Sequence, residues 1–182
     1  MADYYLQFSE SLGGLTFAER EWLARQLETI FVVNGRECTF DELPDGGSQA
    51  DISWCGLRLF RELAANDEDD DGEAGFQFVL NTDPAAGCYL WLYAEADGRP
   101  DHAAYLVQRF LQTFRPRACW SLTYAVTCSK PRLGAFGGGA LFVTADTIEP
   151  LHAHAFIDSR RTAFDALQHR SPMERTIHDH AA

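Results

Sequence analysis

The sequence predicts an α+β protein with a largely antiparallel sheet of about five strands and amphipathic helices packed mainly on one face. Three observations lead to this prediction. Apolar and polar residues alternate along Trp120–Cys128, which is the spacing of a half-buried strand. Apolar residues recur at helical spacing after Thr16 and after Asp101. Short turn signals such as Asp83-Pro84 separate neighbouring strand patterns, and strands joined by short turns pair antiparallel.

The chain begins with a strand followed by a helix. Tyr4–Ser9 alternates apolar and polar residues, and the glycines at 13 and 14 then turn the chain. Thr16 and Glu19 have the spacing of a capping box, in which each side chain satisfies a backbone N–H of the other. The apolar spacing that follows predicts a helix over Thr16–Phe31.

Residues 34–75 are predicted to be an insertion in the domain. It contains a short strand near Cys38–Phe40 and a second helix capped by Asp51. The apolar stripe that predicts this helix consists of Ile52, Cys55, Leu59, Phe60 and Leu63.

The second half of the chain has the clearer pattern. A nearly all-apolar run over Cys88–Ala94 predicts a strand in the interior of the sheet. The remaining expected elements, in order, are a strand at Phe76–Leu80, a helix capped by Asp101 and ended by Pro116, the strand Trp120–Cys128, a glycine-rich connection Gly134–Gly139, a strand Ala140–Ala145, and a last helix capped by Asp146 or Thr147.

Length and composition predict one intracellular domain. The chain of 182 residues suits a single core, which we place at 1–170, with a polar and frayed tail at 171–182. No apolar run approaches the roughly 20 residues that span a bilayer, and the N-terminus lacks the pattern of a signal peptide. The five cysteines form no C-x-x-C pair, so we expect no disulfide framework and no zinc site. We also expect no cofactor, and we expect the protein to be cytoplasmic.

The negative charge is concentrated in the first part of the chain. Residues 1–75 contain 5 basic and 17 acidic residues, whereas residues 76–182 contain 10 of each, so the whole net charge of −12 belongs to the first part. This distribution argues against direct nucleic-acid binding, which needs a basic surface, and favours a basic protein as partner. The expected contact residues are Asp67, Glu68, Asp69, Asp70, Asp71 and Glu73.

The same acidic run resembles the start of a calcium loop but is incomplete. Asp67, Asp69 and Asp71 have the spacing of calcium ligands, and Gly72 follows as the turn residue. The twelfth position of the loop, which needs a glutamate, is Phe78. The interpretation we favour is a solvated acidic loop without a metal.

A glycine-rich hairpin is the second candidate site. Lys130 and Arg132 precede Gly137, Gly138 and Gly139, and glycine amides with cations can hold a phosphate. A P-loop, however, leads from a strand into a helix, and here a strand follows. The structural alternative is that the glycines serve turn geometry or let another backbone come close, and we predict the turn.

These patterns favour an interaction module over an enzyme. The expected function is to present an acidic surface to a basic protein, including the case of an inhibitor whose carboxylates imitate nucleic-acid phosphates. The alternative is an enzyme or a nucleotide- or phosphate-binding protein that uses the hairpin from Lys130 to Gly139. His152 and His154 could bind one metal ion together only if their segment is extended, because residues two apart on a helix point about 200° from one another.

Overall fold

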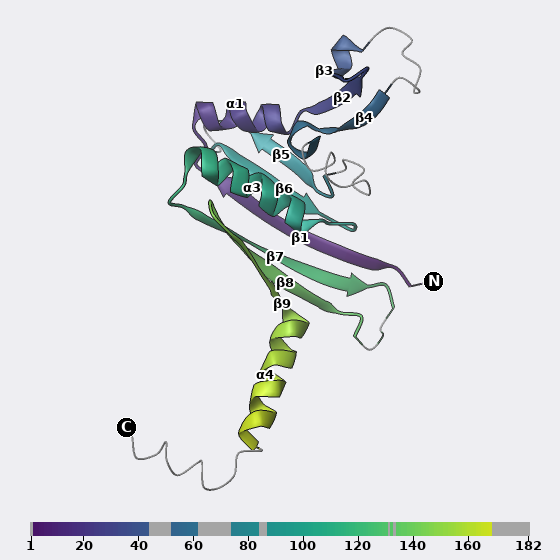
Figure 1. Cartoon of the computed structure of the whole chain (residues 1–182), viewed down its shortest axis with the longest axis vertical. Coiled ribbons are helices and arrows are strands. Elements are labelled where there is room, and N and C mark those ends of the chain that lie inside the picture. The colour runs from purple at the N-terminus through teal and green to yellow at the C-terminus, as the bar shows by residue number, and fades with distance from the viewer. Residues whose placement is uncertain are drawn as a thin grey trace.

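The computed structural model describes residues 2–43, 52–61, 74–83, 87–130, 132 and 134–168. Within these residues, a six-stranded antiparallel sheet, a three-stranded sheet and three α-helices form the predicted α+β fold (Figure 1). None of the described helices is long and apolar enough to cross a membrane.

The large sheet has the order β5-β6-β1-β7-β8-β9, and neighbouring strands all pair antiparallel. The long β1 lies in its middle between β6 and β7, and β6 is interior, as its apolar run predicts. The strands are β1 (Tyr4–Gly13), β5 (Gln77–Asn81), β6 (Tyr89–Ala94), β7 (Cys119–Cys128), β8 (Gly137–Thr144) and β9 (Ile148–His152).

The core lies between one face of this sheet and helix α3 (Pro100–Phe114). Strand alternation places Leu90 and Leu122 on this face, and α3 covers them with a stripe that includes Leu106 and Phe110. Each of these side chains is fully buried, which contributes about 1.5–3 kcal/mol apiece. The other face is solvated, as is usual for an antiparallel sheet, and carries exposed hydroxyl side chains such as that of Ser121.

Helix α1 (Phe17–Gln26) packs beside α3 (Figure 1). Its predicted capping box is present, because the Thr16 N–H donates to Glu19 Oε2 at 2.7 Å and the Glu19 N–H donates to Thr16 Oγ1 at 3.4 Å. Trp22 of α1 meets Phe110 and Phe114 of α3 edge to face, with ring centroids 6.2 and 5.9 Å apart. A local sequence signal thus starts α1, and aromatic packing fixes it against the core.

The prediction that the first helix continues to Phe31 is wrong. Helix α1 ends at Gln26, and the next residues form β2 (Thr29–Val33), the central strand of the small sheet. The segment Thr-Ile-Phe-Val-Val is β-branched and aromatic, which favours a pleated strand, and it gains two strand partners there. Ile30 is buried in this sheet and does not extend the helical stripe.

The predicted helix after Asp51 is also a strand. Residues Ile52–Leu57 form β4, which pairs with β2, and Arg58–Phe60 form the short 3₁₀-helix η3. Gly56 disfavours a helix interior, and β2 provides a ready edge for pairing. The third strand, β3 (Arg36–Cys38), ends two residues before the predicted Phe40, which begins the 3₁₀-helix η1 (Phe40–Glu42). Asp51 and Leu63 lie outside the described residues, as does the predicted tail at 171–182.

The last helix begins later than its predicted cap. Thr144 and Thr147 close a turn in which the Thr144 N–H donates to the Thr147 carbonyl at 2.9 Å, and β9 follows. Pro150 explains this outcome, because proline lacks the N–H that a helix interior needs but is tolerated on the outer strand of a sheet. Helix α4 (Ala153–Gln168) therefore starts at the end of β9 and extends away from the sheet (Figure 1).

Candidate functional site

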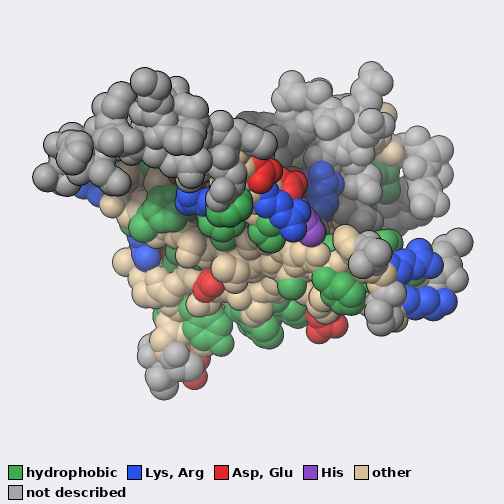
Figure 2. Space-filling view, turned by 90° about the horizontal axis from the view of Figure 1, so that it is seen from below, with side chains coloured by type: hydrophobic (Ala, Val, Ile, Leu, Met, Phe, Trp, Pro, Cys, Tyr) green, Lys and Arg blue, Asp and Glu red, His purple; other side chains and the backbone are tan. Residues whose placement is uncertain are grey.

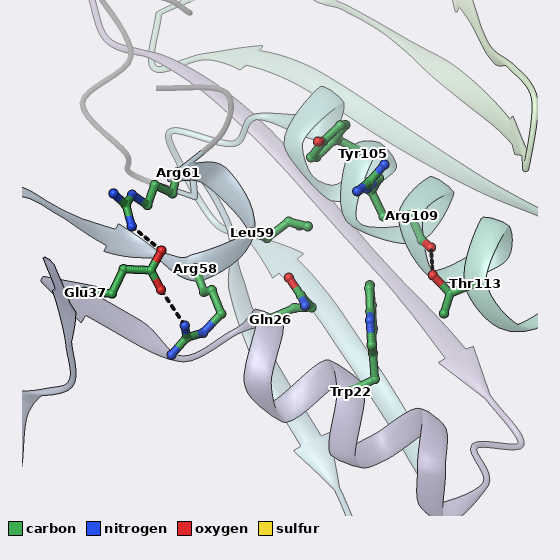
Figure 3. A pocket seen from close by; sticks show the side chains of 9 residues that line it. All are labelled: Trp22, Gln26, Glu37, Arg58, Leu59, Arg61, Tyr105, Arg109 and Thr113. Atoms are coloured by element: carbon green, nitrogen blue, oxygen red, sulfur yellow. Dashed lines mark hydrogen bonds and ion pairs between the residues drawn. The ribbon is translucent and has the colours of Figure 1, made fainter. Parts of the chain in front are cut away.

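A pocket of about 330 Å³ opens between the two packed helices and the segment that follows the small sheet (Figure 3). This volume lies at the lower end of the roughly 300–1,000 Å³ typical of ligand sites. Its lining residues come from four elements: Trp22 and Gln26 from α1, Glu37 from β3, Arg58, Leu59 and Arg61 at η3, and Tyr105, Arg109 and Thr113 from α3.

One wall of the pocket is an ion-pair network. The Glu37 carboxylate accepts from Arg58 at 2.8 Å and also from Arg61. The Arg58 guanidinium makes a second ion pair, with Glu28, at 2.8 Å. Two carboxylates therefore balance two guanidinium groups. Because all four side chains are partly exposed, each pair contributes at most about 1 kcal/mol, and their main effect is to hold β3 beside η3.

The opposite wall carries a charge, on Arg109, that no described residue neutralises. Tyr105, Arg109 and Thr113 follow one another at four-residue spacing, so they share one face of α3 (Figure 3). The Thr113 hydroxyl donates to the Arg109 carbonyl at 2.8 Å. The Arg109 guanidinium forms no ion pair with any residue in the described part of the chain. The described lining thus has a net positive charge in a protein whose net charge is −12.

This arrangement is suited to holding an anion. A guanidinium group presents planar donors that match a carboxylate or a phosphate. The Tyr105 hydroxyl and the Gln26 amide are further hydrogen-bonding groups in the lining, and Trp22 and Leu59 give it an apolar part. Among the described lining residues, the one carboxylate, that of Glu37, is held by two arginines.

Sequence reasoning missed this pocket because its walls are brought together only by the tertiary fold. One signal was available: Tyr105, Arg109 and Thr113 form a polar stripe at helical spacing on α3. The residues on the other wall could not be placed, since the segment around Arg58 was predicted to be helical and is instead a strand followed by η3.

Away from the pocket wall, another ion pair joins α1 to the end of α3. Arg115 Nε donates to Glu19 Oε1 at 2.7 Å, and Arg115 Nη2 donates to Glu19 Oε2 at 3.0 Å. The same guanidinium donates to the carbonyls of Gly13 and Gly14 at 3.2 and 2.8 Å. The hydrogen bonds from Arg115 and from Thr16 hold the pKa of the Glu19 carboxyl well below its usual range, at about 2, against the opposing effect of burial. We assign this pair a structural role.

The predicted acidic contact residues lie outside the described residues. This applies to Asp67, Glu68, Asp69, Asp70, Asp71 and Glu73, and so also to the calcium-like spacing among them. In the part of the chain that the structure describes, no three His, Cys, Asp or Glu side chains come together in a way that could hold a metal ion.

The glycines of the second candidate site belong to a strand. We predicted a connection over Gly134–Gly139, but β8 begins at Gly137, and Gly139 pairs with Tyr124 on one side and with His152 on the other. A Cβ atom on Gly138 would overlap the Tyr124 carbonyl oxygen, and one on Gly139 would overlap that of Leu151. Close backbone approach, the alternative to the turn, therefore explains these two glycines. Lys130 and Arg132 are exposed before this strand.

The two histidines near these glycines have separate partners. The Tyr124 side chain lies over Gly139, and its hydroxyl is 2.6 Å from His152 Nδ1. Burial raises the pKa of the Tyr124 hydroxyl, so the hydroxyl keeps its proton and can donate to His152. His154 Nε2 lies 3.0 Å from the Phe136 carbonyl, which can only accept. The two rings are thus engaged in different contacts, at the end of β9 and in the first turn of α4.

Comparison with known proteins finds no matching protein family, no matching curated protein and no matching solved structure. Function is therefore inferred from the residues of this chain.

Proposed function

We propose that this protein is a non-enzymatic interaction module whose acidic part, residues 1–75, binds a basic protein. The observation that carries the proposal is the charge distribution: this part has a net charge of −12 and the remainder of the chain has none. A small domain needs a net charge of magnitude about 2–8 to stay in solution, so the excess calls for another explanation. A protein that binds nucleic acid is one suitable partner, because the carboxylates would occupy its phosphate-binding surface.

The internal ion pairs leave part of this charge available. Glu19, Glu28 and Glu37 are neutralised by arginines of the same chain. Glu21 on α1 and Asp41 on η1 are exposed, and neither forms an ion pair with a residue in the described ranges. They support the proposal as additional acidic groups on the part of the chain that contains Asp67–Glu73.

We expect the change of Asp69, Asp70 and Asp71 to Asn to slow association with the basic partner several-fold while leaving the melting temperature nearly unchanged. Charge-steered association weakens as salt shortens the Debye length from about 10 Å at 0.1 M, so the difference between variant and native protein should shrink in high salt. The partner is first obtained by affinity capture from native cell extract at low and high salt, and association rates are then measured by surface plasmon resonance.

A matched control neutralises three exposed carboxylates outside the acidic part, at Glu95, Asp97 and Asp146. It removes the same formal charge and should slow association less. Equal effects of the two triple variants would show that only net charge matters, and a partner whose affinity ignores both salt and Asp69–Asp71 would refute the proposal.

A second candidate function, binding of a small anion, is favoured by the guanidinium of Arg109 in the pocket, which forms no ion pair with a described residue. In this candidate function the anion binds in the Arg109 pocket and not at Lys130 and the glycines of β8. Ligand binding to the folded state alone raises the free energy of unfolding by about 1.4 kcal/mol at ten times Kd.

We therefore expect phenyl phosphate to raise the melting temperature of the native protein and to have no effect on Arg109→Ala. The measurement is thermal unfolding at increasing ligand concentration. Arg117→Ala removes an exposed arginine that does not line the pocket and should behave like the native protein. Identical responses of both variants would assign the effect to general salt binding and exclude this site.

A further inference from the structure

Helix α4 has an apolar stripe that nothing in the described chain covers. Phe156, Ile157 and Phe164 are 46%, 45% and 59% exposed. Ile157 and Phe164 are seven residues apart, close to two helical turns, and Phe156 lies about 100° from Ile157 around the helix, so the three side chains share one side of it. The helix is anchored to the sheet through its first turn, where His154 contacts the Phe136 carbonyl, and it then projects away (Figure 1).

A helix in this situation gains little stability from its own chain. Helices draw most of their stability from packing an amphipathic face, and isolated helices shorter than about 12–15 residues are marginal in water. Helix α4, with 16 residues, is only just longer than this limit. The side-chain contacts within it, Arg161 with Asp158 and Arg160 over the Phe156 ring, are exposed and contribute only fractions of a kcal/mol. No described residue covers the stripe, so a surface that packs on it would bury its apolar side chains.

The charges of α4 indicate which cover fits. Its described charged side chains are Asp158, Arg160, Arg161 and Asp165, which sum to zero. A basic partner of the kind proposed for residues 1–75 finds no acidic surface here. A second copy of this chain meets no net charge on the described side chains of α4, which lies at the opposite end from the small sheet (Figure 1).

Two further exposed apolar side chains lie near the base of the helix. Phe136 and Leu151, next to the base of α4, are also exposed, at 51% and 54%. Seen from the α4 end, hydrophobic side chains lie at the surface between basic and acidic ones (Figure 2). A helix about 24 Å long together with these residues provides a surface that can approach the roughly 800 Å² per partner of a specific interface.

We propose that α4 is a self-association surface, through which two copies of this chain form a dimer with the stripe of one helix packed on that of the other. A two-fold axis makes such a contact self-complementary, since the same patch serves both copies. Each Phe164 is then buried by the partner.

The test is the oligomeric state of the full chain, measured by sedimentation velocity over a range of concentrations. We expect the native protein to dimerise reversibly and Phe164→Glu to weaken the dimer by roughly thirtyfold or more, the effect of a residue at the centre of an interface. Ile157→Glu should act in the same way. The matched control is Phe17→Glu, which changes a phenylalanine of α1 that is 70% exposed and should leave dimerisation intact.

Thermal unfolding of all variants establishes that they remain folded. A native chain that sediments as a monomer at every concentration would overturn the proposal. So would a dimer that survives both Phe164→Glu and Ile157→Glu, since the contact would then lie elsewhere.

Discussion

Replacing Gly138 with alanine is expected to destabilise the folded protein by roughly 3 kcal/mol or more. Gly138 has φ of +154°, a conformation that residues with a side chain rarely adopt. The added Cβ would also overlap the Tyr124 carbonyl oxygen on β7, so the backbone of β7 or β8 would have to move. Strain and overlap act at the same position, in a strand that is paired with β7 in the large sheet.

The measurement is urea unfolding followed by tryptophan fluorescence. Gly13→Ala is the matched control, because a Cβ at Gly13 meets nothing within 4 Å and the residue has no positive φ. Its free energy of unfolding should stay within about 0.5 kcal/mol of the native value. If Gly138→Ala proves as stable as Gly13→Ala, the glycines of β8 are not required by backbone approach and the turn interpretation would return.

The sequence predicts those elements of this fold whose own pattern decides their structure. The alternation in Trp120–Cys128 corresponds to β7, the apolar run before Ala94 to the interior strand β6, and the stripe after Asp101 to α3. In each of these, hydrophobic periodicity and tertiary burial agree.

The errors fall where a segment has two acceptable local structures and a distant partner selects one. Ile52 and Cys55 have a spacing that suits a helix, yet their segment pairs with β2, whose own residues had been assigned to the first helix. One mistaken boundary therefore concealed the whole small sheet. The glycine run misled for a related reason: the close contacts that require glycine come from Tyr124 and Leu151, on the two neighbouring strands.

The candidate sites also differ in whether the sequence alone reveals them. An acidic run can be recognised from consecutive letters, whereas the Arg109 pocket combines α1, α3, β3 and η3. Arg109 stands out among the described lining residues only when Glu37 and Glu28 are seen to neutralise the arginines of the other wall. The exposure of the apolar stripe on α4 depends on β9, which directs the helix away from the sheet.

Replacing Glu19 with glutamine is expected to lower the free energy of unfolding at pH 7 by about 3 kcal/mol, the lower end of the cost of breaking a buried ion pair. Glu19 is 5% exposed, and its carboxylate accepts from Arg115 and from the Thr16 N–H. Its pKa falls from an ordinary 4.5 to about 2 in the folded protein. At 1.36 kcal/mol per pKa unit, this shift corresponds to roughly 3 kcal/mol of stability, in agreement with the expected loss.

The pH dependence provides the sharper measurement. Because the folded pKa is below the unfolded one, the stability from Glu19 is fully present above about pH 5 and is lost as pH falls from there through about 2. The difference between native protein and Glu19→Gln, measured by urea unfolding at several pH values, should therefore be largest at neutral pH and vanish near pH 2. Glu21→Gln, an exposed position on the same helix, should differ little from the native protein throughout. A constant difference between native and Glu19→Gln protein from pH 7 to pH 2 would mean that Glu19 stabilises the fold by its shape and not by its charge.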